Sequence, residues 1–180
     1  MTAATIPTIP YFSQWESREM TLDVIAHGAA ALARDPNWRN SGATTIEEYA
    51  TWADHVCGMA CLKMILAARD GRARPILELA RACTAYGGYT VNEKGEIKGL
   101  IYAPFVEFVS REFGLEAEVV VDITTDGIAD VLRRARYFIA SVHPSIRWPE
   151  QVPPSKGGHL VLVLQAGADR IVFHNPSGHD

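Results

Sequence analysis

The sequence predicts an α+β protein in which a helical part packs against an antiparallel β-sheet. Helical periodicity dominates the first part of the chain, and short runs rich in β-branched residues gather in the second part. Because these runs follow the helical segments instead of alternating with them, a parallel βαβ sheet is not expected. The 180 residues, 48% of them hydrophobic, are enough for one domain, 1–180, with a single core.

Five stretches carry the apolar spacing of helices: residues 22–33, 45–52, 58–69, 76–85 and 104–113. The first is expected to stop before Pro36, since proline cannot continue a helix. Thr45 and Glu48 form a capping-box pattern at the start of the second, and Gly71 is a typical stop signal for the third. Loops are expected at the glycine pairs and turns of residues 87–88 and 94–95.

Strand-like runs occupy residues 117–121, 137–142, 159–164 and 171–174, with an amphipathic stretch at 127–136. A loop rich in proline and glycine, 144–158, leads into the third run, and a turn at residues 168–170 predicts that the last two runs form a hairpin. We therefore expect a cleft where the helical part meets the sheet, with Cys57 opening a helix on one side and His159 opening a strand on the other.

Composition argues against several classes of partner. The formal net charge is −4, so no basic surface for nucleic acid is expected. No apolar run approaches the roughly 18 residues of a membrane span, and the N-terminal segment does not resemble a signal peptide. We expect a cytoplasmic protein whose three cysteines stay reduced. The sequence leaves the oligomeric state open.

Cys57 differs from the other two cysteines in its surroundings. It precedes Gly58 at the start of a predicted helix, where unpaired N–H groups and a nearby imidazolium would lower the pKa of a thiol and favour the nucleophilic thiolate. Cys61 lies on the apolar stripe of that helix, and Cys83 lies within the next one, so both are expected in the core. Cys57 is therefore the candidate nucleophile.

His159 and Asn175 are the candidate partners of Cys57. The predicted hairpin brings Asn175 toward His159, where its side chain can accept the imidazole N–H and orient the ring. The chain order Cys, His, Asn is that of papain-like enzymes. Trp148 and Gly158, in the loop before His159, are candidates for substrate binding, although Trp148 is also compatible with a loop that caps the core.

Three groups of motifs resemble one family. Cys57-Gly-Met-Ala-Cys-Leu-Lys-Met-Ile-Leu, followed by Pro75-Ile-Leu-Glu-Leu-Ala, resembles the nucleophile helix of the bacteriocin-processing cysteine peptidases that cleave double-glycine leader peptides. Gly158-His159-Leu-Val-Leu-Val-Leu, Asp169-Arg-Ile-Val-Phe and Asn175-Pro176 are similar to that family's histidine strand and hairpin. Pro10-Tyr-Phe-Ser-Gln14 resembles the opening of the free-standing branch, whose glutamine contributes to the oxyanion hole.

The resemblance implies a papain-like cysteine peptidase fold and hydrolysis of a peptide bond through Cys57, His159 and Asn175, with Gln14 as an oxyanion donor. The chain departs from the family at Asn175, where aspartate is common, because asparagine orients an imidazolium without stabilising its charge. The expected partner is a peptide or acyl substrate, and no cofactor is expected.

Three alternatives stay open at this point. The same acyl-enzyme chemistry could transfer the acyl group to an amine, or the cleft could hold a peptide without catalysis. A metal site formed by Cys57, His143, His159 and His174 is the least favoured, because no metal-binding spacing such as Cys-x-x-Cys or His-Glu-x-x-His is present.

Overall fold

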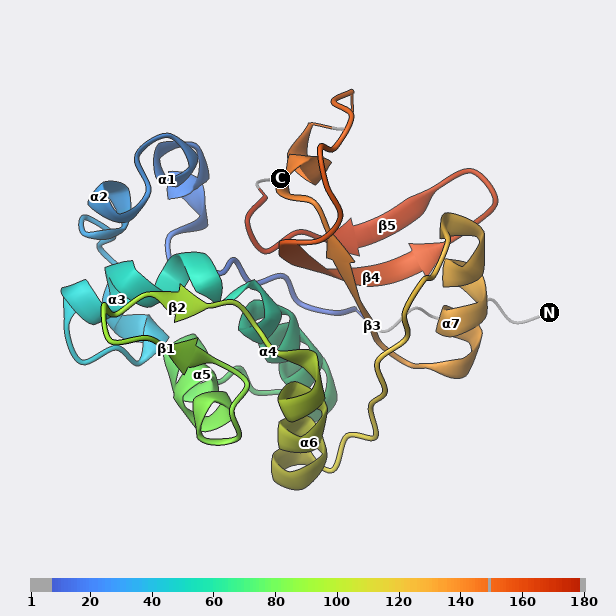
Figure 1. Ribbon diagram of the computed structural model, residues 1–180, viewed down its shortest axis with the longest axis horizontal. Helices are drawn as coiled ribbons and strands as arrows, with labels where there is room; N and C mark the ends of the chain where they lie inside the picture. Colours follow the sequence, from blue (N-terminus) through green and yellow to red (C-terminus); the bar gives the residue numbers. More distant parts are fainter. Residues whose placement is uncertain (1–7, 149, 179–180) are drawn as a thin grey trace.

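The computed structural model describes residues 8–148 and 150–178 and has an α+β architecture (Figure 1). Within these residues the α-helices are α1 (Thr21–His27), α2 (Ala29–Leu32), α3 (Ile46–Trp52), α4 (Cys57–Asp70), α5 (Ile76–Ala85), α6 (Tyr102–Phe113) and α7 (Ile128–Arg134). The strands are β1 (Thr90–Val91), β2 (Ile97–Lys98), β3 (Phe138–Val142), β4 (His159–Ala166) and β5 (Ile171–His174). Short 3-10 helices include η3 (Ala53–His55) and η5 (Pro144–Arg147). No described helix combines the length and apolarity that crossing a membrane requires.

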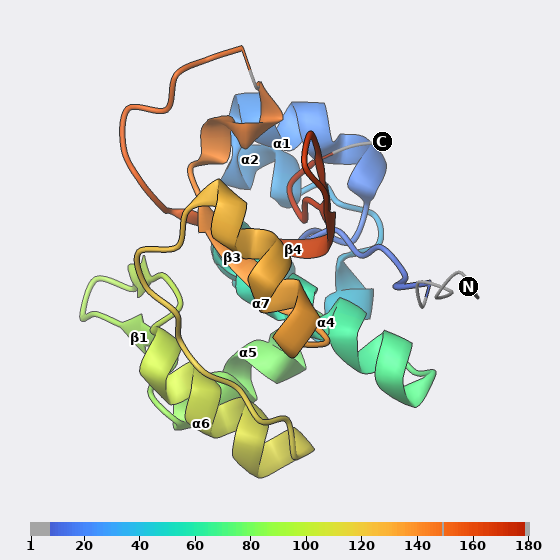
Figure 2. The ribbon, with the colours of Figure 1, turned by 90° about the vertical axis from the view of Figure 1, so that its right-hand side faces the viewer.

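Helix α4 lies between the helical part and the sheet and packs directly on β4 (Figure 1). Figure 2 looks onto α7, with the sheet behind it and α4 beyond. Because helices contact β4 from both directions, the first five residues of this strand, 159–163, are all buried. The start of α4 and the start of β4 are therefore held against each other inside the molecule.

Strand β4 is the centre of a three-stranded antiparallel sheet with the order β3-β4-β5. His159 pairs with Val142 at the end of β3, and Leu162 pairs with His174 at the end of β5. The hairpin predicted for the last two runs is confirmed. Continuing its antiparallel register by three residues places Ser177 opposite His159.

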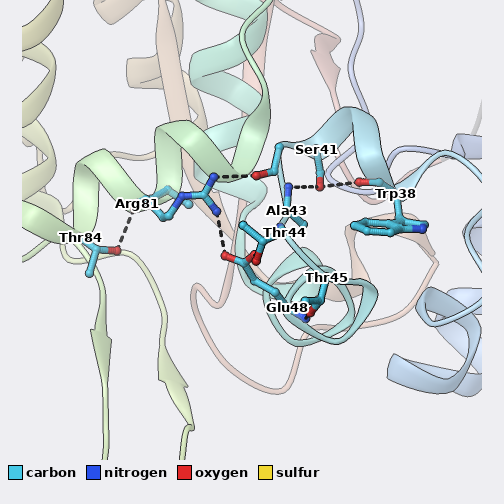
Figure 3. A network of polar contacts seen from close by, with 10 residues as sticks. Trp38, Ser41, Ala43, Thr44, Thr45, Glu48, Arg81 and Thr84 are labelled. Carbon is cyan, nitrogen blue, oxygen red and sulfur yellow. Dashed lines mark hydrogen bonds and ion pairs between the residues drawn. The ribbon is translucent and has the colours of Figure 1, made fainter.

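The helices around the middle of the chain follow their sequence signals. Thr45 caps α3 by accepting the N–H of Glu48 at 3.1 Å, but the Glu48 carboxylate turns back to Thr44 instead of Thr45. Arg81 on α5 donates to Glu48 at 2.8 Å and to the carbonyl of Gly42 at 2.6 Å (Figure 3). These bonds fix the start of α3, which precedes Cys57 in the sequence, to α5.

The helix expected over residues 22–33 is interrupted. Gly28 has a φ of 54°, so α1 ends there and the short α2 begins at the next residue. The helix expected at residues 104–113 begins two residues earlier, at Tyr102. The loop expected around residues 94–95 is the turn of a small hairpin, in which β1 pairs with β2.

The strand expected at residues 117–121 is wrong. The segment has no secondary structure and crosses from α6 toward α7, with Val121 73% exposed (Figure 1). A β-prone run becomes a strand only where a neighbouring strand pairs with it, and β3 pairs only with β4 among the described strands. The later part of the chain consequently contains fewer strands than its composition indicates.

A buried carboxylate holds the segment that follows Gln14 against α3. Asp35 is 1% exposed and accepts hydrogen bonds from the hydroxyls of Ser17 and Tyr49, both at 2.5 Å, and from the N–H groups of Ser17 and Asn37. Burial, reinforced by the hydrogen bond to Asp35, raises the pKa of Tyr49, which therefore stays a donor. Asp35 is thus the acceptor around which three chain segments are ordered.

Replacing Asp35 by alanine is expected to lower the free energy of unfolding by roughly 2 to 4 kcal/mol, because several buried donors lose their acceptor at once. Urea unfolding followed by circular dichroism measures the change. Asp35→Asn keeps one oxygen acceptor and should lose less. An unchanged midpoint for Asp35→Ala would mean that this network does not support the fold.

Candidate active site

Cys57 is the first residue of α4 and is partly exposed, whereas Cys61 and Cys83 are buried. The carbonyl of Val56 accepts the N–H of Ala60 at 2.9 Å, as expected for the residue that precedes a helix. The N–H groups of the first helical residues, including Cys57 itself, therefore have no partner within the helix. The expected contrast between Cys57 and the other two cysteines is present.

The backbone N–H groups of Leu160, Gly58 and Cys57 itself act to lower the pKa of the Cys57 thiol. Burial nevertheless raises the pKa of Cys57, the three N–H groups only oppose this increase, and the charge of Asp54 adds to it. The expectation of a lowered thiol pKa is therefore wrong. Desolvation outweighs the helix start, and the resting form is the neutral thiol.

Gly58 allows α4 to approach β4 closely. A Cβ atom at this position would lie 2.6 Å from the side chain of Leu100 and 2.9 Å from that of Leu160. The Sγ of Cys61 also contacts the carbonyl of Leu160, at 3.8 Å. The start of α4, which carries Cys57, therefore packs against the start of β4, which carries His159.

His159 is 5% exposed, and its Nε2 lies 2.7 Å from Oδ1 of Asn175. That oxygen also accepts the backbone N–H of Ser177, at 3.1 Å, which identifies it as the carbonyl oxygen of the amide. Nε2 must therefore carry the hydrogen in the neutral ring, and Nδ1 keeps its lone pair. Asn175 thus orients His159 with Nδ1 as the available base.

The imidazole is held in its neutral form by its surroundings. Burial lowers the pKa of His159, the hydrogen bond to Asn175 works in the opposite direction, and the nearby charge of Arg147 lowers it further. The charge of Asp54 opposes this decrease. The directions of both pKa shifts favour a neutral thiol and a neutral imidazole over an ion pair.

Cys57 and His159 do not form a hydrogen bond in this structure. Among the described residues, the imidazole of His159 is hydrogen-bonded only through Nε2, to Asn175 and Ser177. Hydrogen bonds between a nucleophile and its base often tighten only when substrate is bound.

Gly157 and Gly158 bend the loop into β4. Their φ angles are 74° and 96°, a region that residues with a side chain rarely adopt. Gly158 is exposed, next to the buried His159. The glycine pair therefore serves the conformation that starts the histidine strand, in addition to any contact with substrate.

Trp148, the other predicted substrate-binding residue, is 39% exposed at the end of η5. Together with Arg147, Phe173 and Asn175 it lines a pocket of about 400 Å³. Neither Cys57 nor His159 lines this pocket. Trp148 therefore borders the Asn175 side of the site and not the thiol itself.

Gln14 is 2% exposed and lies beside the segment that precedes Cys57. Its side-chain Nε2 donates to the carbonyl of Ala53 at 3.0 Å, and its backbone N–H donates to the carbonyl of Pro176 at 2.9 Å. Its Oε1 is buried without a hydrogen-bond partner. One hydrogen of the amide is therefore engaged, and the other is left for an additional acceptor.

The segment that carries Gln14 is bound to the end of β5. Tyr11 donates to the carbonyl of Asn175 at 3.0 Å, and the hydroxyl of Ser13 donates to the carbonyl of Pro176, also at 3.0 Å. His174 Nε2 contacts the carbonyl of Ile9 at 2.9 Å. These long-range contacts join the segment that carries Gln14 to the segment that carries Asn175.

Sequence reasoning missed three polar residues of the site. Ser177 lies 3.1 Å from Nε2 of His159, Arg147 donates to Ser177, and Asp54 acts electrostatically on Cys57, His159 and Arg147. Ser177 could have been found from the hairpin register. Arg147 and Asp54 carry no such signal, because only the folded loops bring them near.

Comparisons with models of protein families, with curated proteins and with solved structures find no match. The site is therefore judged on its own geometry. Among the described residues, no three His, Cys, Asp or Glu side chains are grouped so that they could hold a metal ion. Nothing in that part of the chain supports the metal site formed by Cys57 and the three histidines.

Proposed function

We propose that this protein performs cysteine-dependent acyl-enzyme chemistry, most simply the hydrolysis of a peptide bond, on a papain-like scaffold. Cys57 would be the nucleophile, His159 the base and Asn175 the residue that orients the ring. The observation that carries the proposal is the bond from Nε2 of His159 to Oδ1 of Asn175, next to a partly exposed thiol at a helix start. The sequence motifs that resemble leader peptidases support the choice of a peptide substrate.

The first half-reaction begins with the neutral pair. The thiol proton of Cys57 passes to Nδ1 of His159 while Sγ forms a bond to the substrate carbonyl carbon. The carbonyl oxygen takes the electron pair and becomes an oxyanion. When the intermediate collapses, the C–N bond breaks and the imidazolium returns its proton to the leaving amine. Water then attacks the thioester carbonyl while His159 accepts a proton from it. The C–S bond breaks, the carboxylic acid leaves, and the imidazolium returns the proton to sulfur, which restores the thiol and the neutral imidazole.

The backbone N–H of Cys57 and the second amide hydrogen of Gln14 are the candidate oxyanion donors. The N–H of Cys57 has no acceptor within the helix, because it belongs to the first helical residue. Only one amide hydrogen of Gln14 is needed for the bond to Ala53, so the other is available. Loss of one such donor typically lowers kcat by roughly 100- to 1,000-fold. The engagement of Gln14 with Ala53 would also fix the amide before substrate binds.

A non-catalytic peptide-binding module is the second candidate, favoured by one observation. Cys57 and His159 form no hydrogen bond, and burial raises the pKa of the thiol. A module of this kind would keep the imidazole orientation without using the thiol as a nucleophile. It predicts that peptides are bound and released unchanged.

Product analysis tests the proposal. The protein is incubated with a panel of glycine-rich leader peptides and acyl thioesters, with and without an added amine, and the products are identified by mass spectrometry. Cleavage to a free carboxylate is the expected result. An amide formed with the added amine would assign acyl transfer. Peptides that bind but return intact would overturn the enzymatic proposal in favour of the binding module.

A further inference from the structure

The side chain of Arg147 links the loop before β4 to the segment after β5. Its Nε donates to the carbonyl of Ser177 at 2.8 Å, and a terminal nitrogen donates to the hydroxyl of the same residue. Ser177 is 1% exposed, and Arg147 is partly buried beside it. A guanidinium that makes two bonds to one residue fixes both the position and the direction of that residue.

Ser177 in turn contacts both the proposed base, His159, and the residue that orients it, Asn175. Its hydroxyl lies 3.1 Å from Nε2 of His159 and 3.3 Å from Oδ1 of Asn175. Arg147 can only donate, so the hydroxyl oxygen accepts from it and directs its own hydrogen to Asn175. The same oxygen then faces Nε2 with a lone pair. This distribution of hydrogens is satisfied only when Nε2 carries a hydrogen.

We propose that Arg147 and Ser177 are positioning residues that act through His159, holding its ring in the Nε2–H form so that Nδ1 keeps its lone pair for Cys57. Two acceptors on Nε2 restrict rotation of the ring more than Asn175 alone would. The effect of these residues on catalysis rests on the proposed function, whereas their effect on the tautomer of His159 does not depend on it.

The charges around His159 make the inference testable by pH. Arg147 approaches from η5 and lowers the pKa of His159, whereas Asp54 approaches from η3 and raises it. Cys57 on α4 is neutral at rest, and Asn175 and Ser177 carry no charge. Removing the guanidinium should therefore raise the pKa of His159, and removing the carboxylate should lower it. A purely structural role would not produce opposite shifts.

Nitrogen NMR of the histidine rings in the full chain provides the first readout, since the ring nitrogen shifts report both the tautomer and the titration midpoint. Arg147→Met is expected to raise the midpoint of His159, and Asp54→Asn to lower it. Arg147→Lys keeps the charge without the two-pronged contact, so it should leave the midpoint close to that of the wild type and weaken the Nε2–H preference. Ser177→Ala leaves the charges of Arg147 and Asp54 in place and should also weaken the preference for a hydrogen on Nε2.

The second readout is kcat/KM on a substrate found by product analysis. Arg147→Lys and Ser177→Ala are expected to lose about 10- to 100-fold, the typical cost of a small misplacement of a catalytic group. Arg170→Met, at an exposed turn, is the matched control and should behave as the wild type. If Arg147→Met and Ser177→Ala fold normally and leave both the tautomer and the midpoint unchanged, the inference is overturned. Altered ring behaviour in a protein that turns over no substrate would support the inference and reject the proposed function.

Discussion

Cys57→Ala is expected to abolish turnover, with a loss of at least about 10³-fold in kcat, since no other thiol of the chain can replace this nucleophile. Cys61 and Cys83 are buried, and burial raises the pKa of Cys83 to about 12 and that of Cys61 well above its ordinary value. The small side chain of alanine should leave α4 and its contact with β4 intact. Turnover and the circular dichroism spectrum of the variant are measured together.

Labelling by iodoacetamide tests the same residue without a substrate. In the native protein, label should enter Cys57 alone and should enter faster as pH rises through the alkaline range, because burial raises the pKa of that thiol and the thiolate is the reactive form. Cys61→Ala is the matched control and should label like the wild type. Equal labelling of Cys57→Ala and wild type, or full activity in that variant, would rule out Cys57 as the nucleophile.

His159→Gln is expected to lower kcat/KM by roughly 100- to 10,000-fold, the range typical of a lost general base. The fold should survive, because Oδ1 of Asn175 still accepts the N–H of Ser177 when the imidazole is gone. Thermal unfolding, measured beside the activity, checks this point. His27→Gln removes an exposed histidine and should leave activity unchanged.

The pH profile separates a base from a structural residue. In the proposed mechanism His159 acts in its neutral form, and burial lowers its pKa, so wild-type activity should persist below the pH at which an ordinary histidine becomes protonated and fall only at more acidic pH. In His159→Gln this acidic limb should disappear, and the residual rate should follow ionisation of the thiol. A variant that keeps the wild-type limb would show that another group is the base.

Local signals were sufficient where neighbours in the chain decide the structure. The sequence was sufficient to predict the cap at Thr45, the spacing of α4 and the turn after β4, because a helix start or a tight hairpin depends on a few adjacent residues. The same reasoning failed at residues 117–121, where strand propensity was present but a partner strand was not. Gly28 shows the converse, since one glycine interrupts a helix that composition favours.

Some features of the candidate site could likewise be predicted from local sequence signals, and others could not. Cys57 and His159 could be selected from the sequence because each opens a regular element, and Asn175 could be placed by the hairpin. The protonation state could not be predicted, because a helix start lowers the pKa of a thiol while burial raises it, and only the folded environment gives the balance.

The sequence by itself determined the α+β class, the main helices, the hairpin and three residues of the candidate site, since each depends on short-range periodicity or turn chemistry. Only the tertiary structure decided that the thiol and imidazole rest neutral, that Gln14 donates to Ala53, and that Arg147 reaches Ser177 beside His159. The physical reason is that desolvation and long-range hydrogen bonds depend on which distant segments meet, and residues such as Arg147 and His159 meet only when the loop between them has folded.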